Sequence, residues 1–163
     1  MATISGFKFD TADGAGKMVD LVQDLSKQQL IVLEDAATVT WEKGKKKPKT
    51  KHLDDMTGTG ALGGAFWGML FGLIFFVPFF GMAVGAALGA LAGHFANAGI
   101  DKDFIKQAQD KVTEGTSAVF LMTKDAVSDK VTDAVKDSGL KFELFYTNLS
   151  KDQEAQLRAD YGS

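Results

Sequence analysis

Residues 56–100 of the chain read MTGTGALGGAFWGMLFGLIFFVPFFGMAVGAALGALAGHFANAGI. These 45 residues include no Asp, Glu, Lys or Arg, although such residues make up 24% of the whole chain. Glycine recurs at every fourth position in two sets, which are Gly60, Gly64, Gly68 and Gly72, then Gly81, Gly85, Gly89 and Gly93. With about 3.6 residues per helical turn, this interval places each set on one face of a helix. The stretch therefore predicts apolar helices with bare glycine faces.

A proline divides this stretch into two arms. Pro78 stands between the two glycine sets, within the run Phe75-Phe-Val-Pro-Phe-Phe80. Proline in a helix interior removes a hydrogen bond and breaks or kinks the helix. The pattern thus predicts a helical hairpin with its turn at Pro78. Glycine lets a second backbone approach closely, as in GxxxG packing, so we expect the glycines to join helices within the hairpin or between copies of the chain.

The residues outside the hairpin alternate between strand and helix patterns. In chain order they predict strand 3–9, helix 10–29, strand 30–41, an exposed lysine-rich connection 42–53, helix 101–115, strand 117–123, helix 125–137, strand 140–147 and helix 150–161. Asp10 or Thr11 is expected to cap the first helix. Glu34 and Asp35 interrupt the second strand, where a bulge is expected. Ser150 and Gln153 have the form of a capping box.

This order predicts an α+β fold. Two βαβ halves that flank an insertion suggest a ferredoxin-like split βαβ sheet with helices on one face. Residues 1–55 and 101–163 would form this discontinuous domain, and residues 56–100 the inserted glycine-zipper hairpin.

Charge is unevenly distributed along the chain, whose net charge is −3. Residues 1–41 carry a net −3, residues 42–55 a net +3 and residues 101–163 a net −3. The basic cluster consists of Lys43, Lys45, Lys46, Lys47, Lys49 and Lys51. Its position beside the apolar hairpin favours a positive-inside flank or contact with lipid headgroups, and a solvated loop is the alternative. No basic face or stacking aromatics accompany it, so nucleic acid is not an expected partner.

The sequence predicts no catalytic, cofactor or metal site. It contains no cysteine, which excludes disulfides and thiolate metal sites. Neither a nucleophile–base pair nor metal-ligand spacing is evident, so we expect no enzyme activity. His94, with Asn97 one turn later, could gate protons or bind a metal, but a polar residue at a helix end is the simpler interpretation. His52 is expected to be exposed, and Trp67 to pack away from the glycine face.

Several of these segments resemble the bacterial DUF1269 family. They are Leu33-Glu-Asp-Ala-Ala37, Trp41, Gly44-Lys-Lys-Lys-Pro-Lys-Thr50, Thr59-Gly-Ala-Leu-Gly-Gly-Ala-Phe-Trp-Gly68, Phe75-Phe-Val-Pro78, Gly99-Ile-Asp101, Asp103-Phe-Ile105 and Asn148-Leu-Ser-Lys151. Their order and spacing, rather than any one of them, carry the resemblance, which extends over nearly the whole chain. It implies a membrane protein of unknown function and brings no catalytic residues.

The length of each arm suits a membrane. Thr57 to Val77 would measure about 31 Å as a helix, against a hydrocarbon core of about 30 Å. Two spans would leave the folded domain on one side, and the lysines predict that this side is the cytoplasm. The turn has no polar residue, which favours a hairpin that ends inside lipid or is covered by other copies. The first residues show no secretory signal.

These observations lead to a hypothesis of a non-enzymatic, membrane-associated homo-oligomer. Its glycine-zipped hairpins would assemble copies as a membrane scaffold, or as a pore, for which few polar lining residues are available. The expected partners are the chain itself and membrane lipid. The alternatives are a soluble regulatory or ligand-binding module, or a soluble high-order cytoplasmic particle with its hairpins buried inside.

Overall fold

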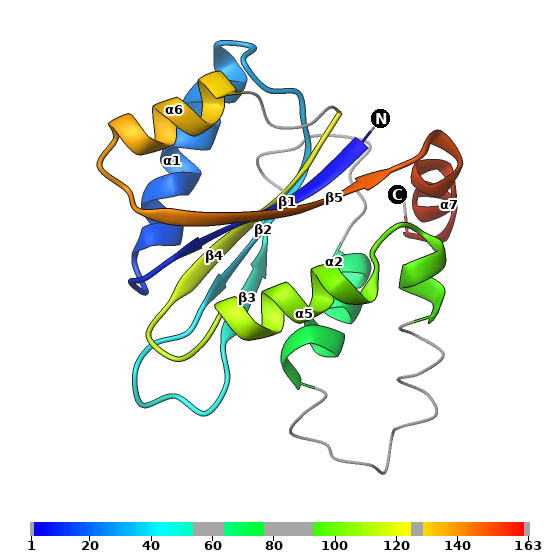
Figure 1. Cartoon of the computed structure of the whole chain (residues 1–163), viewed down its shortest axis with the longest axis horizontal. Helices are drawn as coiled ribbons and strands as arrows, with labels where there is room; N and C mark the ends of the chain where they lie inside the picture. Colours follow the sequence, from blue (N-terminus) through cyan, green and yellow to red (C-terminus); the bar gives the residue numbers. More distant parts are fainter. Residues whose placement is uncertain (1, 54–63, 77–92, 125–128, 162–163) are drawn as a thin grey trace.

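The computed structural model describes residues 2–53, 64–76, 93–124 and 129–161 (Figure 1). They form an α+β fold built on a five-stranded antiparallel sheet. The strands are β1 (Ala2–Phe9), β2 (Leu33–Thr40), β3 (Lys49–His52), β4 (Ser117–Thr123) and β5 (Phe142–Leu149). The helices are α1 (Gly14–Lys27), α2 (Gly64–Phe71), the π-helical η2 (Gly72–Phe76), α5 (Lys102–Lys111), α6 (Asp129–Asp137) and α7 (Lys151–Tyr161).

The strand order is β3-β2-β4-β1-β5. Strand β4, from the second half of the sequence, is therefore inserted between β2 and β1, from the first half. β4 lies between β2 and β1, and all seven of its residues are buried. The prediction that residues 117–123 form a central strand is confirmed. An apolar run of this kind is typical of a strand that is covered on both faces.

Helices cover both faces of this sheet (Figure 1). On one face α1 and α6 pack over residues such as Phe7 and Leu121. On the other face α2, η2 and α5 pack over Ile4, Phe120 and Phe145. The expectation of helices on one face was wrong. Because successive residues of a strand point to opposite sides, the apolar residues of β4 create two faces to bury, and the first arm of the apolar stretch covers the second one.

Several local predictions are confirmed. The β2–β4 register shifts between Leu33 and Asp35, where a bulge was expected. Ser150 and Gln153 form the reciprocal capping box: the Ser150 N–H donates to Gln153 Oε1 at 2.9 Å, and the Gln153 N–H donates to Ser150 Oγ at 3.1 Å. Of the expected helix 125–137, residues 125–128 lie outside the described residues, and α6 covers the rest.

Other boundaries differ from the prediction. Helix α1 begins at Gly14, and its N-cap residue Asp13 makes no side-chain cap bond, so neither Asp10 nor Thr11 caps it. β2 begins at Leu33 rather than at residue 30, because the chain turns at Gln29, which has φ +60°. The short strand β3 within the expected loop was not predicted; it pairs with β2 at the edge of the sheet.

Candidate functional site

Helix α2 and the following η2 segment have one aromatic face, which packs on the protein's own sheet. Phe66, Trp67 and Phe71 are buried, as expected for Trp67. The centroid of the Phe71 ring lies 5.1 Å from that of Phe120 in β4, and the centroid of the Trp67 ring lies 6.5 Å from it. These contacts fix the orientation of the helix on the folded body.

Glycines lie on the opposite face of this helix. Gly64 and Gly68 are exposed and Gly72 is half-buried. Among the residues that the structure describes, no heavy atom lies within 4 Å of the position that a Cβ would take at any of the three, or at Gly93. Met69, 47% exposed, lies between Gly68 and Gly72 in the sequence. The aromatic contacts thus leave a glycine face turned away from the sheet. We refer to Gly64, Gly68 and Gly72 as the glycine face.

Of the predicted hairpin, the structure describes residues 64–76 and 93–100. Gly60, Gly81, Gly85, Gly89 and the predicted turn residue Pro78 lie outside the described residues. The direction that the second glycine set faces therefore stays a prediction. Within the described ranges, no helix combines the length and the apolar character needed to cross a bilayer.

The predicted lysine cluster lies at the β2–β3 connection, and residues 42–49 are here named the lysine loop. Hydrogen bonds hold its shape. Trp41 Nε1 donates to the carbonyl oxygen of Lys45 at 3.0 Å, and the Gly44 N–H donates to Glu114 Oε1 at 2.5 Å. The Gly115 N–H donates to the carbonyl oxygen of Trp41 at 2.6 Å. Gly44 has φ +85°, a backbone conformation that favours glycine. The loop is therefore braced against the turn that follows α5.

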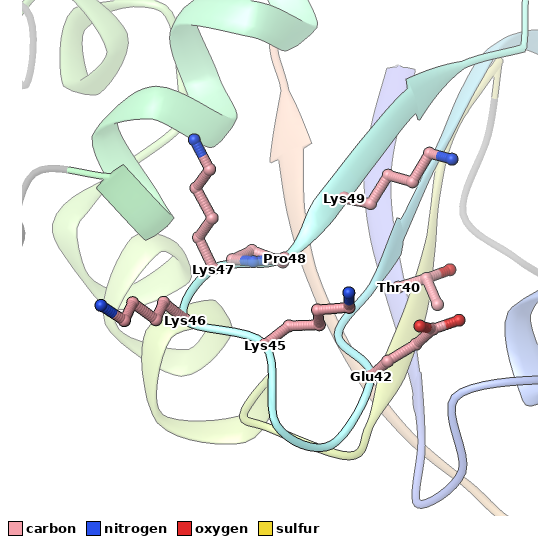
Figure 2. A pocket seen from close by; sticks show the side chains of 7 residues that line it. All are labelled: Thr40, Glu42, Lys45, Lys46, Lys47, Pro48 and Lys49. Atoms are coloured by element: carbon pink, nitrogen blue, oxygen red, sulfur yellow. The ribbon is translucent and has the colours of Figure 1, made fainter.

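A cavity of about 560 Å³ opens on the lysine loop (Figure 2). Its lining consists of Thr40, Glu42, Lys45, Lys46, Lys47, Pro48 and Lys49. The lysine side chains point in different directions in Figure 2: Lys46 and Lys47 extend away from Lys49, which projects from the start of β3. The other two predicted lysines do not line the cavity: Lys43, also in the lysine loop, packs its side chain near Gly115, and Lys51 is an exposed residue of β3. The lining thus concentrates positive charge on one loop.

The lysine loop and the apolar helix meet at one end of the protein. The Trp41 ring, directly before the loop, packs edge-on against Phe75 of η2, with 6.5 Å between the ring centroids. The chain continues from η2 into residues 77–92, a segment whose sequence contains no charged residue. The basic loop therefore lies beside η2, the last described part of the first apolar arm.

The two histidines occupy different settings. His94 and Asn97 line a shallow cavity of about 370 Å³ together with Asp152, Gln153 and Gln156 of α7. His52, expected to be exposed, is instead held against the bulge of β2: its Nε2 lies 2.7 Å from Oδ1 of the buried Asp35. This pair was missed, although an aspartate inside an otherwise apolar strand is a sign of a buried polar partner. No group of three or more metal-ligating side chains occurs in the part of the chain that the structure describes.

Taken together, the described residues define an α+β protein with an apolar helix anchored on its sheet and a basic loop at one end of that helix. The family described as "Protein of unknown function (DUF1269)" matches residues 61–162, well over half of the 163 residues. The chain belongs to this family. The segments Leu33–Ala37, Trp41 and Gly44–Thr50, which contributed to the resemblance, precede the matched range. Comparisons with curated proteins and with solved structures find no match.

Proposed function

We propose that this protein is a non-enzymatic, membrane-associated homo-oligomer whose copies pack through the glycine faces of their apolar helices. The observation that carries this proposal is the opposed arrangement of α2, with its aromatic residues on the sheet and Gly64 and Gly68 on the outside. A helix held in this way presents its bare backbone in a fixed direction. Because α2 is already held on the sheet, a second helix can pack against it without the entropic cost of first ordering α2.

The energetics favour a partner for this face. Glycine inside a helix costs up to about 1 kcal/mol relative to alanine. No described residue packs closely enough against the glycine face to require glycine there. Close packing of a second helix backbone against these glycines, as in GxxxG pairs, would offset the free-energy cost of glycine in the helix. In this proposal the partner helix comes from another copy of the chain.

We further propose that the sheet belongs to the ferredoxin-like type. The order β2-β4-β1-β5, with antiparallel neighbours, is compatible with two interleaved βαβ halves, and β3 is an additional edge strand. In this proposal residues 1–55 and 101–163 face the cytoplasm, while the charge-free stretch associates with the membrane as a scaffold. The supporting observations are the lack of charge in residues 56–100 and the basic loop beside η2.

The test replaces Gly64 and Gly68 together by leucine. Both positions are exposed, so the monomer is expected to fold as before. The particle size of the detergent-extracted protein, measured by sedimentation, should fall towards the 17.5 kDa of one chain. Gly16→Leu is the matched control, because Gly16 is an exposed helical glycine of α1 with open space around it among the described residues.

Two results would contradict the proposal. A wild-type protein that sediments as a single copy would remove the homo-oligomer. An unchanged particle in the Gly64→Leu/Gly68→Leu variant would show that copies meet elsewhere. Large particles in the supernatant of lysed cells, without detergent, would favour the soluble assembly over the membrane scaffold.

A further inference from the structure

We propose that the lysine loop is a docking site for the phosphate groups of an anionic lipid surface. This inference rests on the membrane association proposed above and names the membrane component that the loop recognises. It concerns three lysines, Lys45, Lys46 and Lys49, which line the same cavity at the β2–β3 connection.

The positive charge of these lysines is available to a ligand. All three are exposed, and none of them forms an ion pair with the residues that the structure describes. Among the residues that line the cavity, Glu42 is the one acid. Lysine binds phosphate as a point charge, so a cluster with this excess attracts anions.

The loop is also ordered before a ligand arrives. Trp41 Nε1 donates a hydrogen bond to the carbonyl oxygen of Lys45, and the Gly44 N–H donates one to the Glu114 carboxylate. Two positions of the loop are therefore hydrogen-bonded to residues outside it. Pro48, which is buried, fixes the backbone just before β3. A backbone that is already ordered loses less conformational entropy on binding.

The arrangement favours a surface of many phosphates over one phosphate ion. The lysine side chains spread apart in Figure 2 rather than turning towards one point. Separate lysines each gain from a charged surface, where each contributes about fivefold to binding. The Trp41–Phe75 contact sets the loop beside η2, a part of the stretch 56–100 that carries no charged residue. A bilayer offers both components that this end of the protein matches, namely anionic headgroups and hydrocarbon.

The same features speak against nucleic acid. The lysines stand on one loop rather than along a face, and the chain as a whole is acidic, with net charge −3. Nucleic-acid-binding domains more often carry a basic face with stacking aromatic residues. Trp41 is engaged with the loop backbone and with Phe75, so its ring is not free to stack on a base.

The experiment compares the wild-type chain with a Lys45→Gln/Lys46→Gln/Lys49→Gln variant. Binding is measured to vesicles of phosphatidylglycerol and phosphatidylcholine in equal parts and to vesicles of phosphatidylcholine alone. The preference of the wild type for anionic vesicles should fall by roughly a hundredfold in the variant, at about fivefold per lysine. Binding to neutral vesicles should not change. The preference should also weaken with added salt.

The matched control removes the same charge elsewhere. Lys27→Gln/Lys136→Gln/Lys141→Gln alters three exposed lysines in α1, in α6 and directly before β5, all outside the cavity. It should retain the preference for anionic vesicles. An equal loss in both variants would overturn the proposal, because net charge alone would then explain binding. The indole N–H signal of Trp41 in an NMR spectrum reports whether the loop remains folded in each variant.

Two further probes separate the sources of phosphate. Inorganic phosphate should shift the Trp41 indole signal only weakly and should compete poorly with vesicles. Tight binding of inorganic phosphate without a preference for anionic vesicles would overturn the proposal in favour of a soluble phosphate compound. Tighter lysine-dependent binding to duplex DNA than to anionic vesicles would overturn it in favour of nucleic acid. A single-copy protein that still shows the lysine-dependent preference would reject the homo-oligomer and keep this site.

Discussion

Gly6 in β1 lies directly beneath the ring of Phe145 in the neighbouring strand β5. A Cβ at Gly6 would lie 2.7 and 2.8 Å from Cε2 and Cε1 of that ring. Because Phe145 is 2% exposed and also packs against Phe104 and Phe120, it has little room to move. We predict that Gly6→Ala lowers the free energy of unfolding by about 1–3 kcal/mol.

Chemical denaturation measures this change. Gly16→Ala is the control, because Gly16 is an exposed helical glycine with open space among the described residues. It should stabilise the protein by up to about 1 kcal/mol. Equal changes in the free energy of unfolding for Gly6→Ala and Gly16→Ala would show that the Phe145 ring can move to accommodate a Cβ at Gly6.

Two exposed aspartates differ in what lowers their pKa. The Asp10 pKa is lowered chiefly by its hydrogen bond from Lys8, whose Nζ lies 2.6 Å from Asp10 Oδ1. The Asp13 pKa is lowered chiefly by a hydrogen bond with Thr11 and then by Lys17. We predict that Lys8→Gln raises the pKa of Asp10 alone, and that Thr11→Val raises the pKa of Asp13 alone. NMR titration of the two carboxyl groups measures both changes.

The sign of the accompanying pH dependence follows from the direction of these shifts. A carboxyl group whose folded pKa lies below its unfolded pKa contributes stability above the unfolded value, and this contribution is lost as the pH falls through the folded value. Both variants should therefore lose less stability on acidification than the wild type. Because both carboxylates are exposed, solvent keeps the effect small. A shift of both pKa values in either variant would contradict the separate causes.

At the scale of single elements, helix α5 depends on its cap. Asp101 Oδ1 accepts a hydrogen bond from the Phe104 N–H at 2.9 Å. We predict that Asp101→Ala lowers the free energy of unfolding by about 0.5–2 kcal/mol, whereas Asp101→Asn keeps most of the stability. Thermal unfolding followed by circular dichroism measures the change. Asp103→Ala, in the first turn of the same helix, removes a charge without removing this bond and should have a smaller effect.

The elements also show which parts of the fold can be predicted from the sequence. β4 was predicted with its exact bounds because seven apolar or small residues between turns admit few alternatives. β3 was missed because Lys49-Thr-Lys-His52 has no apolar pattern and forms a strand only by pairing with β2. Helix α2 was predicted, but its packing on the sheet was not, since its apolar residues suit lipid and protein equally.

The same distinction holds for the candidate site. The lysine cluster and the glycine repeat can be seen in the sequence. The bracing of the lysine loop cannot, because it depends on Glu114 and Gly115, about 70 residues away in the chain and placed beside the loop only by the turn after α5. The Asp35–His52 pair likewise requires the strand β3 that the pattern does not predict.

At the scale of the whole molecule, the first apolar arm is part of the core as well as a candidate interface. Phe71 packs against Phe120 and Phe75 at the centre of one face of the sheet. We predict that Phe71→Ala lowers the free energy of unfolding by about 3–5 kcal/mol. Met69→Ala, at an exposed position of the same helix, should change it by less than about 0.5 kcal/mol.

A deletion tests the same point for the whole arm. Joining residues 1–55 to residues 101–163 removes α2 and η2, and with them part of the cover of Ile4, Phe120 and Phe145. We predict that the shortened chain loses cooperative unfolding and aggregates, because a large apolar surface is exposed to water. Size-exclusion chromatography and calorimetry measure both properties. A stable, monomeric shortened chain would show that α5 and α7 cover that face without the arm.

The edge strand β3 has a consequence for how neighbouring molecules can approach. It is four residues long, and its lysines, Lys49 and Lys51, are exposed at alternate positions. A short, charged border strand is a poor template for an incoming strand. Fusion of sheets into a continuous ribbon is therefore disfavoured along this border.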